Sequence, residues 1–348
     1  MSRELIDLYS DTQSQPTSQM REFMARASVG DEQQRLDPTV NELCEKTAAL
    51  LGKEAAVFLP SGAMCNHVAI KTHTNPGEEI ILDKTAHVRH FETNSYAVVS
   101  GVGLNTLSGD RGVYSGDQLK EAVRANDNHM GISSLMVVEQ TTNLGAGKIW
   151  SLEQISEVTS TARDYGLKCH MDGARLMNAV VASGVDAKLY SRYFDSVWID
   201  FSKGLGAPVG AALAGSREFI EKAWRYKHML GGAMRQAGII AAGALYALEH
   251  HIDRLAIDHE NATMLANLIS DIPGLDIWPV ETNMVYFDPT ALGTTADAFG
   301  KKLLKNGLKC STIGRQEVRM VTYLDISKQM IIKASEIIRQ TVEETLSE

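Results

Sequence analysis

Short apolar runs alternate with longer amphipathic segments through the first two-thirds of the chain. Helix-length stretches such as residues 152–166 separate the later runs. Buried strands that alternate with helices of ten or more residues are typical of βαβ units and a largely parallel sheet. The pattern therefore predicts an α/β fold whose mainly parallel central sheet is flanked by helices. The apolar runs are residues 55–60, 78–83, 133–140, 167–172 and 195–202.

The pattern changes at about residue 250. A long polar helix over 249–271 precedes short strands around residues 284 and 319, and a final helix ends the chain. This order is typical of a small α+β unit. We therefore predict a large domain over residues 1–250, including the N-terminal segment, and a small C-terminal domain over residues 251–348.

Composition and charge restrict the kind of partner. Hydrophobic residues make up 44% of the chain and charged residues 22%, as in an ordinary globular protein. The formal net charge is −9 and the Lys and Arg residues are scattered, so we expect no nucleic-acid partner. No apolar run approaches the roughly 18 residues of a membrane helix, and the first residues lack the apolar stretch of a secretory signal. We expect no membrane association.

The four cysteines are widely spaced and form no Cys-x-x-Cys pair. This spacing argues against a zinc site and against a disulfide framework, so we expect reduced thiols and no metal. Together with the N-terminal sequence, it predicts a cytoplasmic protein.

Three strand ends carry candidate chemistry. Ser61, Gly62 and Ala63 form a small-residue turn that opens a helix, where free N–H groups and the helix dipole favour a phosphate. Many helices begin with Ser-Gly, so this motif is weak by itself. Asp172 closes an apolar strand, and a carboxylate there can keep a proton on the pyridine nitrogen of pyridoxal phosphate (PLP). A lone Asp at this place can equally cap the next helix.

Lys203 follows a hydrophobic strand and precedes a glycine-rich turn. A lysine at such a strand end can form a Schiff base with the aldehyde of PLP and later move the α-proton of a substrate. About one βαβ unit separates it from Asp172, so both side chains can converge on one cofactor. Each motif is ambiguous alone, and their order and spacing together predict a PLP site.

Several longer motifs carry a family resemblance over nearly the whole chain. In these motifs the chain resembles the L-threonine aldolase family, fold-type-I PLP enzymes within the group called β-eliminating lyases. The resemblance implies the PLP-transferase-like fold and PLP as cofactor. The motifs are DLYSDTQSQPTSQMREFM, GDEQQRLDPTVNEL, PSGAMCN, AHVRHFE, HMDGARLMNAVVASG, SKGLGAPVG, GGAMRQAG, TNM near residue 283 and VRMVTYLD near residue 320.

The resemblance also implies roles for individual residues around the cofactor. Lys203 corresponds to the Schiff-base lysine and Asp172 to the partner of the pyridine nitrogen. His87 is similar to the histidine that stacks on the cofactor ring and orders a catalytic water, although a strand-end histidine can also be purely structural. The implied phosphate ligands are Ser61, Gly62, Ala63, His228 and, from a neighbouring subunit, Arg235.

On the substrate side, the resemblance implies that Ser10 and Arg319 grip the carboxylate, with the guanidinium as a bidentate clamp. Arg175 is expected to bind either that carboxylate or the phenolic oxygen of the cofactor. Thr142 and Tyr323 correspond to residues on the β-carbon side of the substrate.

Departures from the family pattern gather near the expected substrate pocket. Tyr9 replaces the arginine of DLRSDT, and residues 33–36 lack an aromatic side chain that the family has in the pocket wall. Thr142 and Tyr323 each stand where the family has histidine, in ENTHN and VTH. His228 replaces a lysine near the phosphate, and Ala63 replaces the threonine of PSGT. The cofactor residues are thus kept while the β-carbon side is changed, which suggests an altered substrate preference or reaction.

The resemblance favours an enzyme that cleaves the Cα–Cβ bond of a threonine-like β-hydroxy-α-amino acid to glycine and an aldehyde. A PLP lyase that eliminates a β-substituent, or a racemase, fits the same residues. A non-catalytic relative is a third reading, against which Lys203, Asp172 and Arg319 together argue. Because Arg235 is expected to serve another subunit, we expect at least a homodimer, and the resemblance favours a tetramer with shared active sites.

Overall fold

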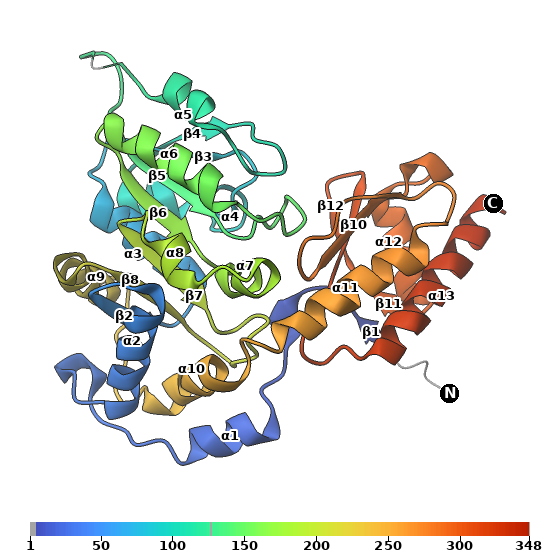
Figure 1. Ribbon diagram of the computed structural model, residues 1–348, viewed down its shortest axis with the longest axis horizontal. Coiled ribbons are helices and arrows are strands. Elements are labelled where there is room, and N and C mark those ends of the chain that lie inside the picture. Colours follow the sequence, from blue (N-terminus) through green and yellow to red (C-terminus); the bar gives the residue numbers. More distant parts are fainter. Residues whose placement is uncertain (1–4, 126, 348) are drawn as a thin grey trace.

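A computed structural model describes residues 5–125 and 127–347 of the chain. Its centre is a seven-stranded sheet (Figure 1). The strands are β2 (Ala55–Leu59), β3 (Glu79–Asp83), β4 (Gly103–Leu107), β5 (Ser133–Glu139), β6 (Lys168–Asp172), β7 (Ser196–Asp200) and β8 (Ala211–Gly215). They follow the order β2-β8-β7-β6-β5-β3-β4, in which β8 is antiparallel to both neighbours and every other pair is parallel. The predicted α/β fold with a mainly parallel sheet is confirmed.

Most of the strands are nearly continuous apolar runs because helices cover both faces of the sheet. Successive residues of β2 point to opposite faces of the sheet, so Val57 and Leu59 pack in one hydrophobic cluster and Phe58 packs in another. The cluster of Val57 and Leu59 includes side chains of α3 (Gly62–His73) and α9 (Arg217–Met229). Helices on the opposite face are α2 (Pro38–Leu51), α5 (Gly116–Ala122), α6 (Leu152–Asp164), α7 (Leu176–Ser183), α8 (Ala187–Ser191) and α10 (Gly238–His250).

Local sequence signals set the ends of these helices. Asp37 accepts a hydrogen bond from the Val40 N–H at 3.0 Å, and Pro38 occupies the first turn, as at many helix starts. Helix α2 then ends at Gly52, whose φ of 61° lies in the left-handed region that favours glycine. Ser61 caps α3 in the same way, through the N–H of Met64. The helix that follows β2 therefore begins at the predicted turn.

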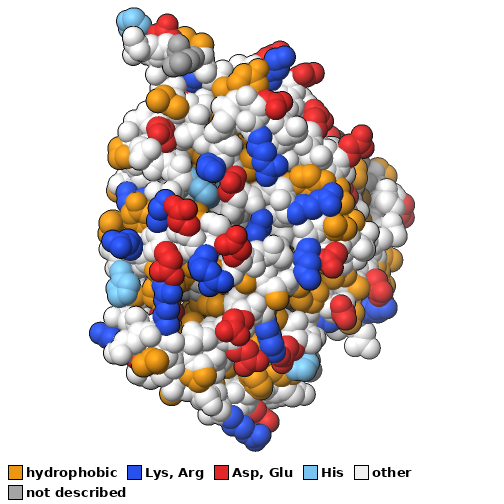
Figure 2. Space-filling model, turned by 60° about the vertical axis from the view of Figure 1, so that its left-hand side comes forward, with side chains coloured by type: hydrophobic (Ala, Val, Ile, Leu, Met, Phe, Trp, Pro, Cys, Tyr) orange, Lys and Arg blue, Asp and Glu red, His pale blue; other side chains and the backbone are white. Residues whose placement is uncertain are grey.

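Shorter helical segments connect the main elements. They are α1 (Ser18–Ala25), which packs on α10, and α4 (His87–His90), together with the single turns η1 (Asp11–Gln13), η2 (Glu32–Gln34), η3 (Tyr96–Ser100) and η4 (Thr290–Leu292). On the face of the molecule seen in Figure 2, acidic and basic side chains are interspersed. Across the described residues, no helix combines the length and the apolar character needed to cross a membrane.

The C-terminal part has its own sheet and core. An antiparallel sheet has the order β12-β13-β10-β9, and a separate hydrophobic cluster packs beneath it. Its elements are α11 (Leu255–Ile269), β9 (Asp276–Ile277), β10 (Met284–Asp288), α12 (Ala296–Lys305), β11 (Leu308–Lys309), β12 (Ser311–Ile313), β13 (Glu317–Val321) and α13 (Lys328–Leu346).

The N-terminal strand belongs to this second core. Strand β1 (Ile6–Asp7) pairs in parallel with β11, and Figure 1 shows it beside the C-terminal elements. Ile6 and Leu8 are buried in the C-terminal cluster. Their position differs from the expectation that the N-terminal segment belongs to the large domain, because the apolar pattern of so short a strand does not reveal its partner. We retain a domain boundary near residue 250 as a proposal, with residues 6–8 assigned to the small domain.

Candidate active site

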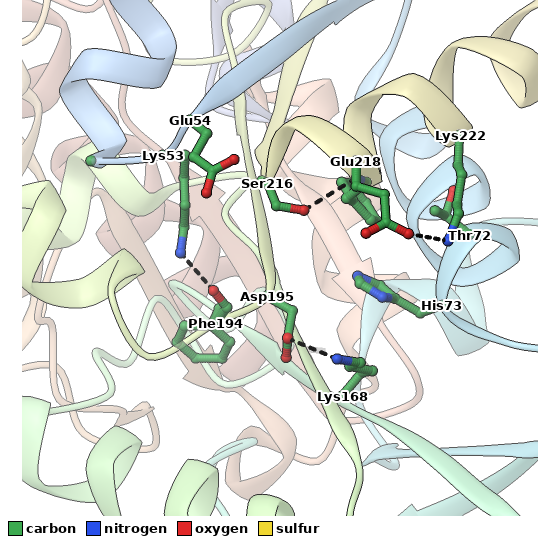
Figure 3. A pocket seen from close by; sticks show the side chains of 13 residues that line it. Lys53, Glu54, Thr72, His73, Lys168, Phe194, Asp195, Ser216, Glu218 and Lys222 are labelled. Atoms are coloured by element: carbon green, nitrogen blue, oxygen red, sulfur yellow. Dashed lines mark hydrogen bonds and ion pairs between the residues drawn. The ribbon is translucent and has the colours of Figure 1, made fainter.

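The carboxyl ends of the parallel strands meet at one edge of the sheet, where ligands bind in open α/β folds. A cleft of about 390 Å³ lies there and is lined by residues that follow or close β2, β3, β5, β6 and β7. A second cavity of about 470 Å³ opens at the opposite edge, where β6 and β7 begin (Figure 3). That cavity contains none of the predicted site residues, so the first cleft is the candidate active site.

Most of the predicted residues come together in this cleft, although they are far apart in the sequence. Two of them, Ser10 and Arg319, come from opposite ends of the chain. The predicted residues that line the cleft are Ser10, Ser61, Gly62, Ala63, His87, Asp172, Arg175, Lys203 and Arg319.

The remaining predicted residues lie outside the cleft of this single chain. Thr142 is buried in the segment after β5, where its backbone pairs with Lys148. Tyr323 is also buried, and its hydroxyl donates to the Asp7 carbonyl at 2.9 Å. His228 is exposed in the last turn of α9, and the exposed Arg235 pairs with Asp31 at 3.0 Å. Within this chain, therefore, the cleft is not lined by Thr142, Tyr323, His228 or Arg235.

Lys203 extends into the cleft from the glycine-rich turn after β7. Its Nζ lies 2.8 Å from Oδ2 of Asp200, the residue that closes this strand. Only 16% of the Lys203 side chain is exposed. The amine of Lys203 is thus held at a defined place by the Asp200 carboxylate.

Gly62 allows helix α3 to begin very close to the sheet. A Cβ atom at this position would lie 2.4 Å from Cη2 of Trp198 and 3.0 Å from Oδ2 of Asp200. Any larger residue would push the helix away from β7. The N-terminus of α3 therefore borders the cleft closely, with its first N–H groups available to an anion.

Asp172 is buried at the end of β6 and accepts two hydrogen bonds. Its Oδ2 accepts from Asn66 Nδ2 at 2.8 Å and its Oδ1 from the Ala174 N–H at 3.1 Å. Burial raises the pKa of Asp172, although the charge of His87 and the Asn66 hydrogen bond oppose that shift. A carboxylate in this setting is stabilised by a cation placed against it.

Glu139 closes β5 beside Asp172 in the sheet register. Its two oxygens accept from the backbone N–H groups of His87 at 2.9 Å and Asn143 at 2.7 Å. Burial, reinforced by the neighbouring Asp172 carboxylate, raises the pKa of Glu139. Glu139 thus fixes the loop that carries His87 while adding a second acidic group to the cleft.

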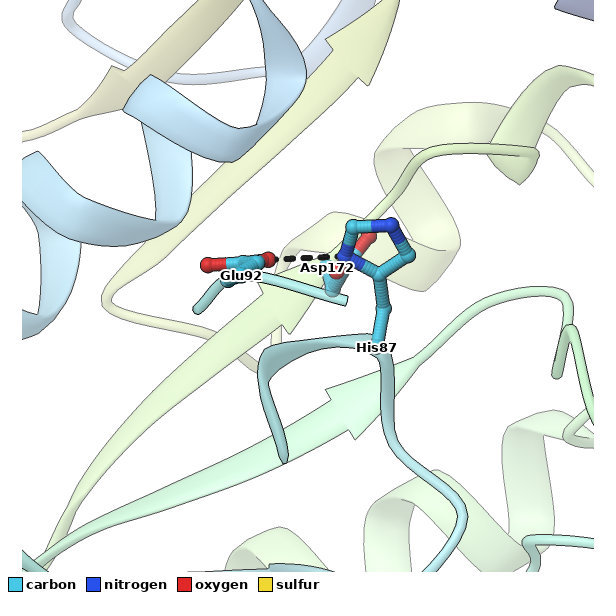
Figure 4. Close-up of side chains that lie close together, drawn as sticks. All are labelled: His87, Glu92 and Asp172. Atoms are coloured by element: carbon cyan, nitrogen blue, oxygen red, sulfur yellow. Dashed lines mark hydrogen bonds and ion pairs between the residues drawn. The ribbon is translucent and has the colours of Figure 1, made fainter. Parts of the chain in front are cut away.

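His87 and Glu92 form a hydrogen-bonded pair next to Asp172 (Figure 4). His87 Nδ1 lies 2.8 Å from Glu92 Oε1. A ring nitrogen of His87 and one carboxylate oxygen each of Glu92 and Asp172 lie within 4.8 Å of one another. Burial alone would lower the pKa of His87, but the bond to Glu92 and the charge of Asp172 outweigh it and raise the pKa. For Glu92 the influences have the opposite signs. Burial alone would raise its pKa, but hydrogen bonds from His67 and His87 lower the pKa to about 2.

The tautomer of His87 follows from this pair. An ionised Glu92 can only accept a hydrogen bond, so Nδ1 of His87 carries the proton. In the neutral ring, Nε2 then has a free lone pair, and it points away from Glu92 in Figure 4. His87 can therefore accept a proton within the cleft.

Arg175 is fixed by a buried ion pair with Asp11, a residue that the sequence analysis did not select. Its Nε and Nη2 each donate to one oxygen of Asp11 at 2.7 Å. Burial opposes the ionisation of Asp11, but the charge and hydrogen bonds of Arg175 lower the pKa of Asp11 to about 2. The Arg175 side chain therefore borders the cleft in a fixed orientation.

Arg319 reaches the cleft from β13 of the small domain. Its Nε donates to Ser311 Oγ at 2.8 Å, Nη1 to Asn143 Oδ1 at 2.9 Å and Nη2 to the Tyr9 carbonyl at 3.3 Å. A guanidinium has five N–H groups, so donors remain for a bound anion. Because its partners come from three separate segments, the position of Arg319 depends on the whole tertiary structure.

Further residues that line the cleft or bond to its lining were not selected from the sequence. Glu139 and Asp200 close apolar runs just as Asp172 does, so the same strand-end rule could have selected them. Glu92, Asn143 and Asp11 lie in irregular segments or single turns. No periodic pattern marks those positions, and their role becomes visible only through their partners.

The sheet topology and the cleft together place the chain in the fold-type-I class of PLP-dependent enzymes. Solved structures with the same fold include a threonine aldolase from Leishmania major, with a TM-score of 0.84 and 19% identity over 97% of this chain and 99% of that one. A structure described as SPT with PLP has a TM-score of 0.74 and 16% identity, and covers 98% of this chain and 88% of that one.

Sequence comparison defines the family. The model of the β-eliminating lyase family matches residues 7–291. The low specificity L-threonine aldolase of Escherichia coli K12 is 38% identical over 337 residues, which cover 95% of this chain and 97% of that one. The chain belongs to the β-eliminating lyases, and within them to the L-threonine aldolase family, as its motifs indicated.

Proposed function

We propose that this protein is a PLP-dependent aldehyde-lyase that cleaves the Cα–Cβ bond of a threonine-like β-hydroxy-α-amino acid to glycine and an aldehyde. The observation that carries the proposal is that Lys203 and Asp172, which follow neighbouring parallel strands, line one cleft together with Arg319. The name of the Escherichia coli relative, a low specificity L-threonine aldolase, supports the choice of substrate class.

The residues of the cleft fit PLP in charge and placement. Lys203 offers the amine for the cofactor aldehyde, Asp172 the carboxylate for the pyridine nitrogen, and the turn over Ser61, Gly62 and Ala63 the N–H groups for the phosphate. When bound, PLP supplies a ring that accepts the electron pair of the breaking Cα–Cβ bond. Asp172 would keep that ring positively charged by holding the proton on its nitrogen.

Arg319 and Ser10 orient the substrate. The unused N–H groups of Arg319 can receive the substrate carboxylate in a bidentate pair, and the Ser10 hydroxyl lies in the same cleft. Arg175 adds a positive charge held still by Asp11. Fixing the carboxylate fixes which bond of Cα is aligned for cleavage, so these residues select the reaction as well as the substrate.

His87 moves the proton that cleavage releases. Its Nε2 accepts the proton of the β-hydroxyl, directly or through one water, while its Nδ1–H remains bonded to Glu92. The β-oxygen then forms the carbonyl of the aldehyde as the Cα–Cβ bond breaks. A proton must return to Cα to release glycine, and the amine of Lys203 lies in the cleft to deliver it.

The cleft is partly open in this chain. Tyr9 is 42% exposed and Phe91 is 50% exposed, and both line the cleft, whereas the buried Thr142 and Tyr323 do not. An apolar and partly open wall of this kind tolerates β-substituents of different size. We therefore propose a broad substrate range, with threonine and allo-threonine as members of it.

We further propose a cytoplasmic homo-oligomer with shared active sites, at least a dimer and, by family resemblance, a tetramer. The exposed Arg235 and His228, which do not reach the cleft of their own chain, would then serve the phosphate of a neighbouring subunit. The four free cysteines suit a reducing compartment.

Product analysis tests the proposed reaction. The PLP-loaded protein is incubated with L-threonine, L-allo-threonine, phenylserine and serine, and the products are separated. Glycine together with the matching aldehyde is the expected result. An oxo-acid in place of glycine would instead establish β-elimination, and an amino acid recovered with inverted configuration at Cα would establish racemisation.

A further inference from the structure

We infer that Asn66 and His170 are positioning residues that hold Asp172. They belong to a buried chain of hydrogen bonds that begins at His73, at the amino edge of the sheet, and ends at Asp172, at its carboxyl edge. The inference rests on the proposed function, since Asp172 is taken to face the pyridine nitrogen of PLP. It assigns a role to residues that line no part of the cleft.

Asn66 is the first member of the chain next to Asp172. It is fully buried on α3, and its Nδ2 donates to Asp172 Oδ2 at 2.8 Å and to Glu92 Oε1 at 2.7 Å. Its Oδ1 accepts from the indole N–H of Trp198 at 2.8 Å. An indole nitrogen can only donate and an ionised carboxylate can only accept, so the orientation of this amide is fixed. Turning it over would break all three hydrogen bonds.

His170 continues the chain on the other side of Asn66. It is fully buried on β6, and its Nε2 lies 3.2 Å from Asn66 Oδ1. Since that oxygen accepts, Nε2 must carry the proton. Burial lowers the pKa of His170 to about 3, so the ring is neutral at physiological pH and its Nδ1 is an acceptor.

Ser196 and His73 complete the chain. Ser196 Oγ lies 2.7 Å from His170 Nδ1 and therefore donates to it. The same oxygen lies 2.7 Å from His73 Nε2 and accepts from that nitrogen. His73 stacks on Phe219 and borders the cavity at the amino edge of the sheet (Figure 3). Each hydrogen bond thus has one defined direction, toward Asp172.

This directionality has a chemical consequence for the cleft. Burial favours the neutral form of Asp172, yet the proposed function needs its carboxylate as an anion. The N–H of Asn66, polarised by the donors behind it, stabilises that anion. Asn66 also reaches Glu92, the partner of His87, so one amide orients acidic groups on two sides of the site. Loss of the chain should weaken the hold of Asp172 on the ring proton.

The test follows the protonation of bound PLP directly. PLP labelled with ¹⁵N in the ring is bound to the wild type and to three variants: Asn66→Ala, His170→Leu and His170→Gln. The ¹⁵N chemical shift is then recorded against pH, and kcat and KM are measured for threonine. His259→Leu is the matched control, because His259 is a partly buried histidine that bonds Asn178 elsewhere.

The wild type and His259→Leu should keep the ring nitrogen of PLP protonated over the whole pH range measured. In Asn66→Ala and His170→Leu the ring nitrogen should lose its proton at a lower pH than in the wild type. The kcat for threonine should fall about 10-fold with little change in KM. Glutamine can both donate to Asn66 and accept from Ser196, so His170→Gln should restore the wild-type shift.

Unchanged ¹⁵N titrations in both Asn66→Ala and His170→Leu would overturn the inference, even if their thermal stability falls, because the chain would then be merely structural. A wild type that binds no PLP would contradict the proposed function itself, and the role assigned to the chain with it.

Discussion

The two sides of the cleft are built in different ways. On the sheet side, Asp172 and His87 follow parallel strands and bond to buried partners, Asn66 and Glu92. On the opposite side, Arg319 lies on the small domain, and its main-chain partner Tyr9 is 310 residues away in sequence and partly exposed.

The difference shows where the molecule can change. A buried hydrogen-bonded network tolerates few substitutions, because each lost partner leaves a polar group unsatisfied in the interior. A half-exposed wall assembled from distant segments is free of that constraint. We therefore expect the sheet side to determine the cofactor chemistry and the opposite side to determine which amino acid is accepted.

The largest effect is expected on the sheet side. Asp172→Asn should lower kcat about 10²- to 10³-fold, since it removes the charge that holds the ring proton. Steady-state kinetics with threonine at saturating PLP measure the effect. Asp164→Asn is the matched control, since it replaces an exposed carboxylate on α6 by the same amide, and it should leave kcat unchanged. A kcat within threefold of the wild type would show that Asp172 is not part of the cofactor site.

On the opposite side, the expected change is in KM. Arg319→Lys keeps the charge but loses the planar pair of donors, so KM for threonine should rise about 10- to 100-fold while kcat changes much less. Arg315→Lys on the same hairpin is exposed and serves as the control. A fall in kcat at constant KM would place Arg319 with the catalytic groups instead.

The pH dependence provides a third comparison. Because the bond to Glu92 raises the pKa of His87, and Nε2 must be unprotonated to accept a proton, kcat/KM should rise as pH increases through that pKa. Glu92→Gln removes the largest of the influences that raise the pKa of His87, so the acidic limb should move to lower pH. The full pH profile is the measurement, with Glu45→Gln on α2 as a surface control. A limb that stays in place would exclude His87 as its origin.

The smallest effect is expected at Tyr323. Tyr323→Phe removes the hydrogen bond to the Asp7 carbonyl, which should reduce the free energy of unfolding by about 1 kcal/mol and leave KM within twofold. Chemical denaturation and steady-state kinetics test both parts. A large rise in KM at unchanged stability would mean that Tyr323 contacts the substrate after all.

The sequence predicted the sheet, and with it the meeting of strand-end residues at one edge, for a physical reason. Lys203 and Asp172 follow apolar runs, and the ends of parallel strands converge whatever the details of packing. Asp11 and Glu92 could not be found in this way, because their function depends on partners brought near by tertiary structure. The expected roles of Thr142 and Tyr323 came from resemblance alone, and in this fold both side chains are buried outside the cleft.

The covalent attachment of PLP to Lys203 tests the account most directly. The protein is loaded with PLP, reduced with borohydride, digested and examined by mass spectrometry. We predict the mass of the reduced cofactor on the peptide that contains Lys203, and its absence in Lys203→Ala. A protein that gains no such mass, or that gains it on another lysine, would contradict the proposed role of Lys203.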